Sequence, residues 1–251
     1  MSSSGPAIEA NAVTKEYGDV RAVDSLDLTV ERGETYGFLG PNGAGKSTTI
    51  GLLLDYLRPT SGTVRVLGRN PRRDIVEVHD RVGVLPDRFG LYADRSARQH
   101  VAFVAETKRV DDDPAALLER VGLGDAVDDD AGEFSSGMEQ RLALAMALVG
   151  DPELLILDEP FSGLDPHGVR RVREIVHEET QRGATVFFSS HVLGQVELVC
   201  DRIGVLHEGQ FVAEGTLDEL RNRTASPEDA TMEDVFVELT DARVDDGDEP
   251  R

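Results

Sequence analysis

The chain has 251 residues, a formal net charge of −22, a single cysteine and no tryptophan. That length suits one large α/β unit with a buried core, and the lack of any 18-residue apolar run excludes a predicted membrane-spanning helix. Residues 1–6 lack the basic and apolar regions of a secretory signal, and the lone Cys200 excludes a disulfide within the chain. We therefore expect a protein of the reducing cytoplasm.

Acidic residues are spread along the whole chain, and only three of the 26 basic residues are lysine, Lys15, Lys46 and Lys108. Because the excess of carboxylates is global, we interpret it as a halophilic surface, adapted to salt concentrations at which ions screen like charges over short distances. The same charge disfavours duplex DNA or RNA as the main ligand, since phosphate binding needs a basic patch and none is visible.

The first part of the chain, residues 7–33, is β-rich. Leu26, Leu28 and Val30 alternate with polar residues, as in a half-buried strand, and Val64 and Val66 repeat the pattern. Tyr17 stands among polar residues, and an exposed aromatic ring there could stack on an adenine. On its own, such a tyrosine is more often a partly buried packing residue.

The segment 40–48 fits the phosphate-binding loop pattern G-x-x-x-x-G-K-S/T, with a predicted strand at 35–39 before it and an apolar helix after it. Glycines allow successive backbone N–H groups to point at phosphates, and the helix N-terminus adds partial positive charge. Lys46 is placed to reach the β and γ phosphates, and the Ser47 hydroxyl to ligate Mg²⁺. The sequence thus predicts a nucleoside triphosphate site made by Gly40, Asn42, Gly43, Ala44, Gly45, Lys46, Ser47 and Thr48.

Between residues 87 and 150 the pattern is helical. Ala97, Val101, Val104 and Ala105 share one face, and Asp113 followed by Pro114 predicts the start of a second helix. The segment 136–139, Ser-Gly-Met-Glu, predicts a capping box ahead of a third. Beyond residue 150, predicted strands at 154–157, 184–189 and 203–206 alternate with helices at 165–183 and 192–200. This order implies βαβ crossovers and a parallel sheet flanked by helices.

Two carboxylates, Asp158 and Glu159, end the apolar strand at 154–157. Burying them is costly without partners, and a magnesium ion with a water molecule would supply these. His191 ends the next strand, and because the carboxyl ends of parallel strands meet at one edge, it should lie near Lys46 and Glu159. A lone histidine at a strand end more often has a structural role. A catalytic role for His191 is therefore supported only by its expected closeness to Lys46 and Glu159.

The segment 134–141, Phe-Ser-Ser-Gly-Met-Glu-Gln-Arg, resembles the LSGGQ signature and its Gln-Arg pair in ATP-binding subunits of ATP-binding-cassette (ABC) transporters. Ser135 lies 23 residues before Asp158, as is typical of that family, and the segment 162–165 resembles its D-loop. The resemblance covers about residues 7–240. The form of residues 85–92 and 232–239 is similar to ATPases that serve drug, lipid or polysaccharide exporter permeases.

The resemblance implies an α/β fold, a P-loop NTPase (RecA-like) core with a mainly parallel sheet, an N-terminal antiparallel β subdomain and an α-helical subdomain at about 88–150. One ABC ATPase domain would cover 7–240. Independently, the apolar spacing of residues 231–239 predicts a last amphipathic helix, and the acidic tail 241–251 is too polar to fold alone, so we expect it to be disordered. Asp158 would then hold Mg²⁺, and Glu159 would activate water as the catalytic base. His191 would be the switch histidine, and Tyr17 the aromatic residue that stacks on adenine.

The chain departs from the family pattern in two places. The signature reads Phe-Ser-Ser-Gly-Met, although Ser135 and Gly137 remain where the helix N-terminus would meet a phosphate. Asp87 stands where the family has the Q-loop glutamine, and a carboxylate there could still ligate Mg²⁺ or position water. Residues 87–98 match the place where the permease docks, and their arginines and aromatics would be the anchors. Alternatively Phe89, Leu91 and Tyr92 only pack the core.

The resemblance implies an ATPase that powers transport, with export favoured, through a separate integral-membrane permease. Two such subunits, expected to be identical, would close head-to-tail on two ATP molecules with Mg²⁺, at the inner face of the cell membrane. The alternative is a soluble ABC ATPase acting on nucleic acid or ribosomes, but 89 residues between Lys46 and Ser135 leave no room for a long coiled coil. A purely regulatory subunit is disfavoured by the presence of Glu159 and His191.

Overall fold

The computed structural model describes residues 5–222, and two sheets organise this part of the chain. The smaller sheet is antiparallel, in the order β2-β1-β4. Its alternating pattern is confirmed: Leu26, Leu28 and Val30 are buried, and Asp27 and Thr29 between them are exposed. The strands of this sheet are β1 (Ile8–Tyr17), β2 (Val20–Val30) and β4 (Ser61–Val66).

The larger sheet has six strands in the order β5-β6-β7-β3-β8-β9, and all of them are parallel except β9, which pairs antiparallel with β8. The strands β3, β6 and β7 in its middle are buried along their whole length, which explains their continuous apolar sequences. The bounds are β3 (Thr35–Leu39), β5 (Val82–Leu85), β6 (Leu154–Asp158), β7 (Thr185–Ser190), β8 (Arg202–His207) and β9 (Gln210–Gly215).

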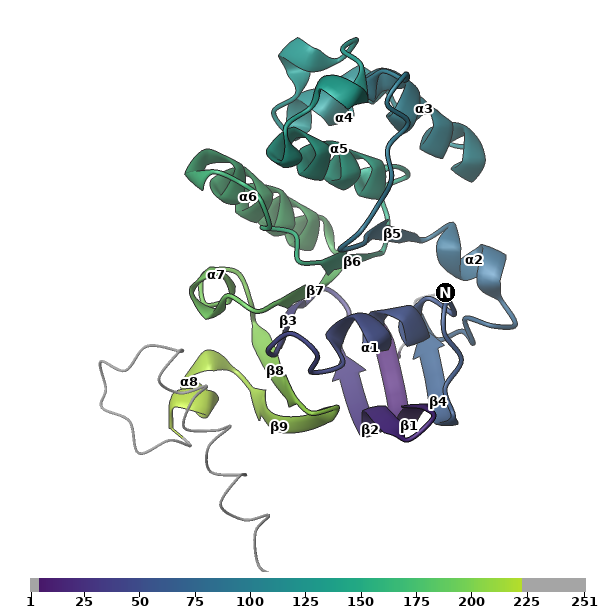
Figure 1. Cartoon of the computed structure of the whole chain (residues 1–251), viewed down its shortest axis with the longest axis vertical. Coiled ribbons are helices and arrows are strands. Elements are labelled where there is room, and N and C mark those ends of the chain that lie inside the picture. Colours follow the sequence, from purple (N-terminus) through teal and green to yellow (C-terminus); the bar gives the residue numbers. More distant parts are fainter. Residues whose placement is uncertain (1–4, 223–251) are drawn as a thin grey trace, which may run out of the picture.

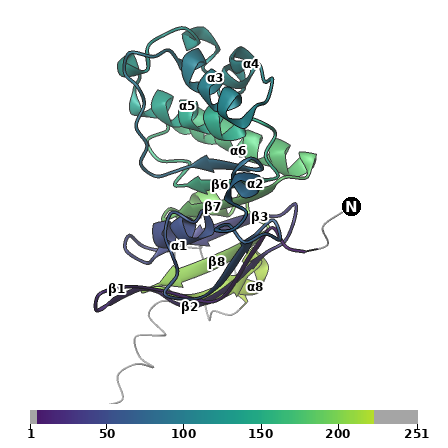
Figure 2. The ribbon, with the colours of Figure 1, turned by 90° about the vertical axis from the view of Figure 1, so that its right-hand side faces the viewer.

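The helices divide into two groups (Figure 1). One group packs around the sheets: α1 (Lys46–Leu53), α2 (Ile75–His79), α6 (Pro166–Arg182), α7 (Leu193–Val196) and α8 (Leu217–Arg221). The other gathers at one end of the molecule, beyond β5 and β6: α3 (Ala97–Lys108), α4 (Pro114–Arg120), the 3₁₀ turns η1 (Gly124–Ala126) and η2 (Ala131–Glu133), and α5 (Ser136–Leu148). In Figure 2 this second group stands clear of the antiparallel sheet at the opposite end. The predicted α/β class, with its parallel sheet, antiparallel β part and helical part, is confirmed.

Two apolar cores correspond to this arrangement. One joins α1 to the antiparallel sheet and to inner residues of the large sheet, including Tyr36, Phe38 and Phe187. The other joins the large sheet to α3, α4, α5 and α6. The helical group is therefore packed on the sheet through α5 and α6, while the phosphate loop is carried by the first core.

Most local predictions are confirmed, and two are wrong in detail. The capping box predicted at 136–139 is absent, because Ser135 is the N-cap of α5: its backbone is extended and its Oγ accepts a hydrogen bond from Met138 N at 3.4 Å. The helix predicted over 192–200 is short, because residues 197–199 form a turn in which Val196 O accepts from both Val199 N and Cys200 N, and the regular helix ends at Val196. The helix predicted at 231–239 and the tail at 241–251 lie outside the described residues.

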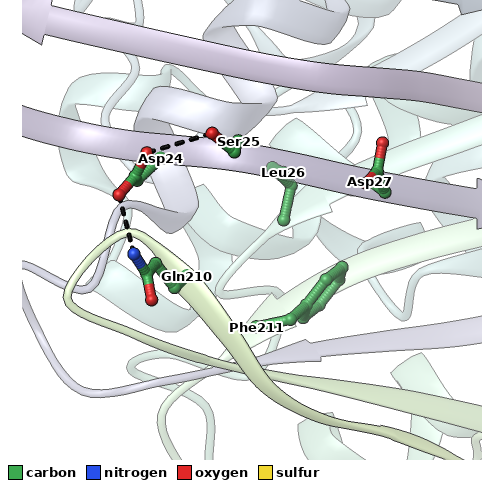
Figure 3. A pocket seen from close by; sticks show the side chains of 6 residues that line it. All are labelled: Asp24, Ser25, Leu26, Asp27, Gln210 and Phe211. Carbon is green, nitrogen blue, oxygen red and sulfur yellow. Dashed lines mark hydrogen bonds between the residues drawn. The ribbon is translucent and has the colours of Figure 1, made fainter.

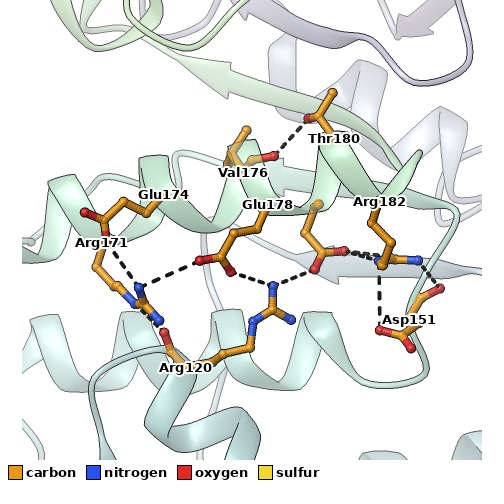
Figure 4. Close-up of polar contacts among 9 residues, drawn as sticks. Arg120, Asp151, Arg171, Glu174, Val176, Glu178, Thr180 and Arg182 are labelled. Carbon is orange, nitrogen blue, oxygen red and sulfur yellow. Dashed lines mark hydrogen bonds and ion pairs between the residues drawn. The ribbon is translucent and has the colours of Figure 1, made fainter.

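A buried carboxylate joins the helical group to α6 (Figure 4). Glu179 is 1% exposed and receives Arg120, at the end of α4, at 2.7 Å and Arg182 at 2.5 Å. Arg120 also reaches Glu178 at 3.0 Å, and its carbonyl accepts from Arg171 Nε. The two arginines offset the cost of burying the Glu179 carboxylate, and they link α4 to α6.

The acidic composition leads to a prediction about stability. At low ionic strength the charge of −22 is poorly screened, because the Debye length is about 30 Å at 0.01 M, and self-repulsion destabilises the compact state. We expect Tm to rise by about 10 °C between 0.05 M and 2 M KCl, equivalent to about 3 kcal/mol for a chain of this size. Scanning calorimetry across that range measures it, and a Tm independent of KCl would contradict the halophilic interpretation.

Candidate active site

The phosphate loop between β3 and α1 needs its glycines for two physical reasons. Gly43 and Gly45 have φ of 86° and 107°, in the left-handed region that favours glycine. A Cβ on Gly45 would lie 2.4 Å from Ala22 O, and one on Gly40 would lie 2.5 Å from Leu206 O. The backbone of this loop therefore approaches two neighbouring strands too closely for a side chain at Gly40 or Gly45.

Those neighbours hold the loop in place. Gly209 N, in the turn between β8 and β9, donates to Ala44 O at 2.9 Å, and Asp24 N on β2 donates to Gly209 O at 2.8 Å. Gln210 Nε2 donates to the Asp24 carboxylate at 2.7 Å, beside an open cavity of about 430 Å³ (Figure 3). A chain of hydrogen bonds thus runs from the antiparallel sheet through the β8–β9 turn to the loop.

Lys46 is buried, with 7% of its surface exposed, at the start of α1. Its Nζ donates to Gly40 O at 2.7 Å and lies 3.6 Å from Glu159 Oε1. Beside it is a cavity of about 190 Å³ lined by Ala22, Pro41, Asn42, Gly43, Gly45, Lys46, Ser47, Thr48, Asp87 and Glu159. The lysine therefore faces the space where the loop would hold phosphates.

Asp158, at the end of β6, is buried, and burial raises the pKa of its carboxyl, while hydrogen bonds from Ser189 and Ser47 act in the opposite direction. The Ser189 hydroxyl donates to Asp158 Oδ1. The Asp158 carboxylate and the Ser47 hydroxyl are oxygen ligands of the kind that Mg²⁺ binds. Mg²⁺ commonly completes its coordination shell with phosphate oxygens and water. Within residues 5–222 no three His, Cys, Asp or Glu side chains form a cluster that could hold a metal.

Glu159 follows Asp158 with φ of 53°, a left-handed backbone that costs a non-glycine residue about 1 kcal/mol. Its backbone N donates to Ser189 Oγ at 3.1 Å. Its Oε2 lies 2.9 Å from His191 Nδ1, and its Oε1 faces Lys46. The structure thus brings Lys46, Glu159 and His191 together, as the sequence predicted.

The remaining predicted residues fall in different places. Asp87 lines the loop cavity, although its side chain is 48% exposed. Tyr17 ends β1 at 47% exposure with the Lys15 ammonium 4.8 Å from its ring centroid, and it does not line the cavity. Ser135 and Gly137 also lie outside that lining, at the N-terminus of α5, where a Cβ on Gly137 would be 3.2 Å from Gly163 O.

Two residues of the site were not predicted to have a role. Ser189 bridges Asp158 and the Glu159 backbone, and Gln140 Nε2 donates to Glu159 O at 3.1 Å. The available signal for Ser189 was its position near the end of the strand before His191. Gln140 was visible only as part of the signature segment, because no spacing rule connects residue 140 to residue 159.

Comparison with known proteins agrees with this geometry. A family model described as ABC transporter matches residues 23–162, more than half of the chain, so the chain belongs to the ABC transporter family. It is 41% identical over 219 residues to the bacitracin transport ATP-binding protein BcrA of Bacillus licheniformis, covering 86% of this chain and 72% of that protein. It is 38% identical over 223 residues to the daunorubicin resistance ATP-binding protein DrrA3 of Streptomyces coeruleorubidus, covering 87% and 71%.

Solved structures show the same fold. An ATP-binding subunit of an ABC transporter superposes with a TM-score of 0.86 at 28% identity, over 93% of this chain and 99% of that one. A dimeric ATP-binding cassette in a post-hydrolysis state, bound to ADP and phosphate, has a TM-score of 0.76 at 22% identity, over 84% and 98%.

The chain is thus an ATP-binding and ATP-hydrolysing subunit of an ABC transporter, grouped with drug- and antibiotic-transport ATP-binding proteins. As such it works with a membrane permease. The soluble ATPase acting on nucleic acid or ribosomes is not favoured. In the part of the chain that the structure describes, no helix is long and apolar enough to cross a membrane.

Proposed function

We propose that this subunit hydrolyses Mg²⁺-ATP at the loop cavity and powers export through its permease from the inner face of the cell membrane. The observation that carries the proposal is the convergence of Lys46, Asp158, Glu159 and His191 at the carboxyl edge of the large sheet. Export is supported by the relatives, which are named for bacitracin transport and daunorubicin resistance.

Each residue has a distinct role in this proposal. The loop N–H groups of residues 40–48 and Lys46 bind the phosphates. Ser47, Asp158 and Asp87 would supply oxygen ligands to Mg²⁺, and the bound ion would neutralise phosphate charge. Glu159 would orient and deprotonate the attacking water. His191 holds the Glu159 carboxylate and would lie within reach of the γ-phosphate.

We further propose a head-to-tail dimer of identical chains. Ser135 and Gly137 lie outside the cavity of their own chain, yet Ser135 is exposed and caps a 13-residue helix whose N-terminus favours an anion. In a head-to-tail pair this N-terminus would meet the ATP bound by the other chain. Each nucleotide would then be neutralised from both sides, and Tyr17 would stack on its adenine.

The permease would bind a groove at the helical group. A cavity of about 590 Å³ is lined by Gly90, Tyr92, Arg95, Gln99, His100, Phe103 and Met146. Tyr92 and Phe103 are 69% and 65% exposed, whereas Phe89 and Leu91 pack against the core. Phe89 and Leu91 are partly buried and pack against the core, as the packing alternative expects. Tyr92 and Arg95 are exposed and remain as anchors of the type enriched at interface hot spots.

Replacing Tyr92 and Arg95 together by alanine tests this function. We expect a folded subunit that binds ATP normally, with permease association weakened by about 30-fold and transport uncoupled from hydrolysis. Co-purification of the membrane subunit and ATP-dependent drug transport measure these effects. The matched control replaces the exposed Tyr56 and Arg58, which lie outside the groove lining. Normal coupling of transport to ATP hydrolysis in the Tyr92 and Arg95 variant would show that the permease docks elsewhere. Unfolding of the variant would show that these side chains serve the fold and not docking.

A further inference from the structure

The N-terminal part of helix α5 carries both a residue of the signature segment and a side chain that contacts the candidate active site. Ser135 caps it, and Gln140 lies just over one turn further along. Gln140 is 8% exposed, and the other buried residues of α5 are all leucine or alanine. The side chain of Gln140 extends away from α5, and its Nε2 donates to Glu159 O at 3.1 Å.

The backbone of Glu159 is held from three directions. Ser162 N, in the segment that resembles the D-loop, donates to Glu159 O at 3.0 Å, so Gln140 gives this carbonyl a second donor. On the opposite side, Glu159 N donates to Ser189 Oγ. Because φ at Glu159 is 53°, an unfavourable value for a side-chain-bearing residue, these bonds must maintain the backbone that aims the carboxylate.

The D-loop segment also touches the start of α5. A Cβ on Gly137 would lie 3.2 Å from Gly163 O, and one on Gly163 would lie 3.5 Å from Ser136 Oγ. Because residues 162–163 pack closely against the start of α5, we expect a displacement of the helix N-terminus to move them together with Gln140. Both donors to Glu159 O thus belong to a unit that includes the signature residues.

We propose that Gln140 is a positioning residue that couples the signature end of α5 to the catalytic carboxylate of its own chain. The inference rests on the proposed head-to-tail dimer, in which Ser135 and Gly137 contact the nucleotide held by the other chain. Nucleotide at one site sets the position of α5, and Gln140 transmits that position to Glu159 at the second site. The two sites therefore hydrolyse ATP cooperatively, and the coupling depends on one side-chain hydrogen bond in each chain.

A merely structural role is the competing explanation, since a buried glutamine needs a partner. In that case Gln140 would contribute to folding but not to the relation between the two sites. The two explanations differ in kinetics: a positioning role affects kcat and the Hill coefficient, whereas a structural role affects thermal stability.

The test is ATP hydrolysis by the full chain as a function of ATP concentration, in wild type and Gln140→Met, which keeps the volume and removes the donor. We expect kcat to fall about tenfold, because a misplaced catalytic group is costly. The Hill coefficient should fall from about 2 toward 1, while binding of a non-hydrolysable ATP analogue changes by less than about twofold. Wild-type kcat and Hill coefficient in Gln140→Met would overturn the proposal.

Two further variants keep the result interpretable. Leu142→Val removes buried volume from the same helix without touching Glu159, so its Tm should fall while its Hill coefficient stays at the wild-type value. Equal loss of cooperativity in Leu142→Val would show that α5 packing alone is responsible and would overturn the role of Gln140. Glu159→Gln distinguishes a failure of the proposed function from a failure of the coupling proposal. If Glu159→Gln hydrolyses ATP like wild type, the assignment of Glu159 as the catalytic base is wrong. If Glu159→Gln is inactive while Gln140→Met behaves like wild type, only the coupling role of Gln140 is refuted.

Discussion

Replacing Glu159 by glutamine is expected to lower the rate of ATP hydrolysis by about 10³-fold without loss of ATP binding. The amide has the shape of the carboxylate but cannot accept the proton of the attacking water. Its carbonyl oxygen can still face Lys46, which lies 3.6 Å from Oε1 in the wild type. Phosphate release measured under saturating ATP gives the rate, and equilibrium binding of labelled ATP gives the affinity.

A control for this variant is available at the same strand edge. His191→Ala removes the group that lies 2.9 Å from Glu159 Oε2 but leaves the carboxylate in place. We expect it to retain more activity than Glu159→Gln, because the base is present although less well held. Hydrolysis at more than a tenth of the wild-type rate in Glu159→Gln would show that another group is the base.

Replacing Lys46 by alanine is expected to weaken ATP binding by about 100-fold or more. Among the described residues that line the cavity in which the loop would hold phosphates, Lys46 is the one Lys or Arg, and the exposed Ser47 beside it carries no charge. With the lysine removed, the stabilisation by ATP should disappear. The increase of Tm on adding ATP, which follows from mass action, is the measurement.

The same lysine also donates to Gly40 O and Pro41 O, so the loss of these bonds must be separated from the loss of phosphate binding. The Tm without nucleotide reports the first effect, and the ATP-dependent shift reports the second. Lys46→Arg keeps the charge and should keep part of the shift. A normal shift in Lys46→Ala would contradict the assignment of the phosphate loop.

Much of the core site could be predicted from the sequence, because its residues are fixed by local rules. The loop at 40–48 lies between a strand and a helix as its pattern requires, and Asp158, Glu159 and His191 follow parallel strands whose carboxyl ends share an edge. The continuous apolar run of β6 correctly predicted a strand buried on both faces.

The features that could not be predicted depend on contacts between segments distant in the sequence, or on which of two adjacent residues of similar type takes a given role. The hydrogen bond from Gln140 to Glu159 joins α5 to the end of β6, and no sequence period encodes it. At the start of α5 the adjacent serines 135 and 136 can both cap a helix, and only the backbone conformation selects Ser135. The division between the core residue Leu91 and the exposed Tyr92 likewise follows from tertiary packing.

The measurement that tests the account most directly is the mass and nucleotide content of Glu159→Gln saturated with ATP. If the signature end of α5 completes the ATP site of a second chain, light scattering should show a dimer that contains two ATP molecules, and removal of ATP should return it to monomers. The additional change Ser135→Arg, which places a bulky cation at the helix N-terminus, should abolish the dimer but not the first ATP-binding step. A monomer that holds one ATP at saturating nucleotide would contradict the composite site.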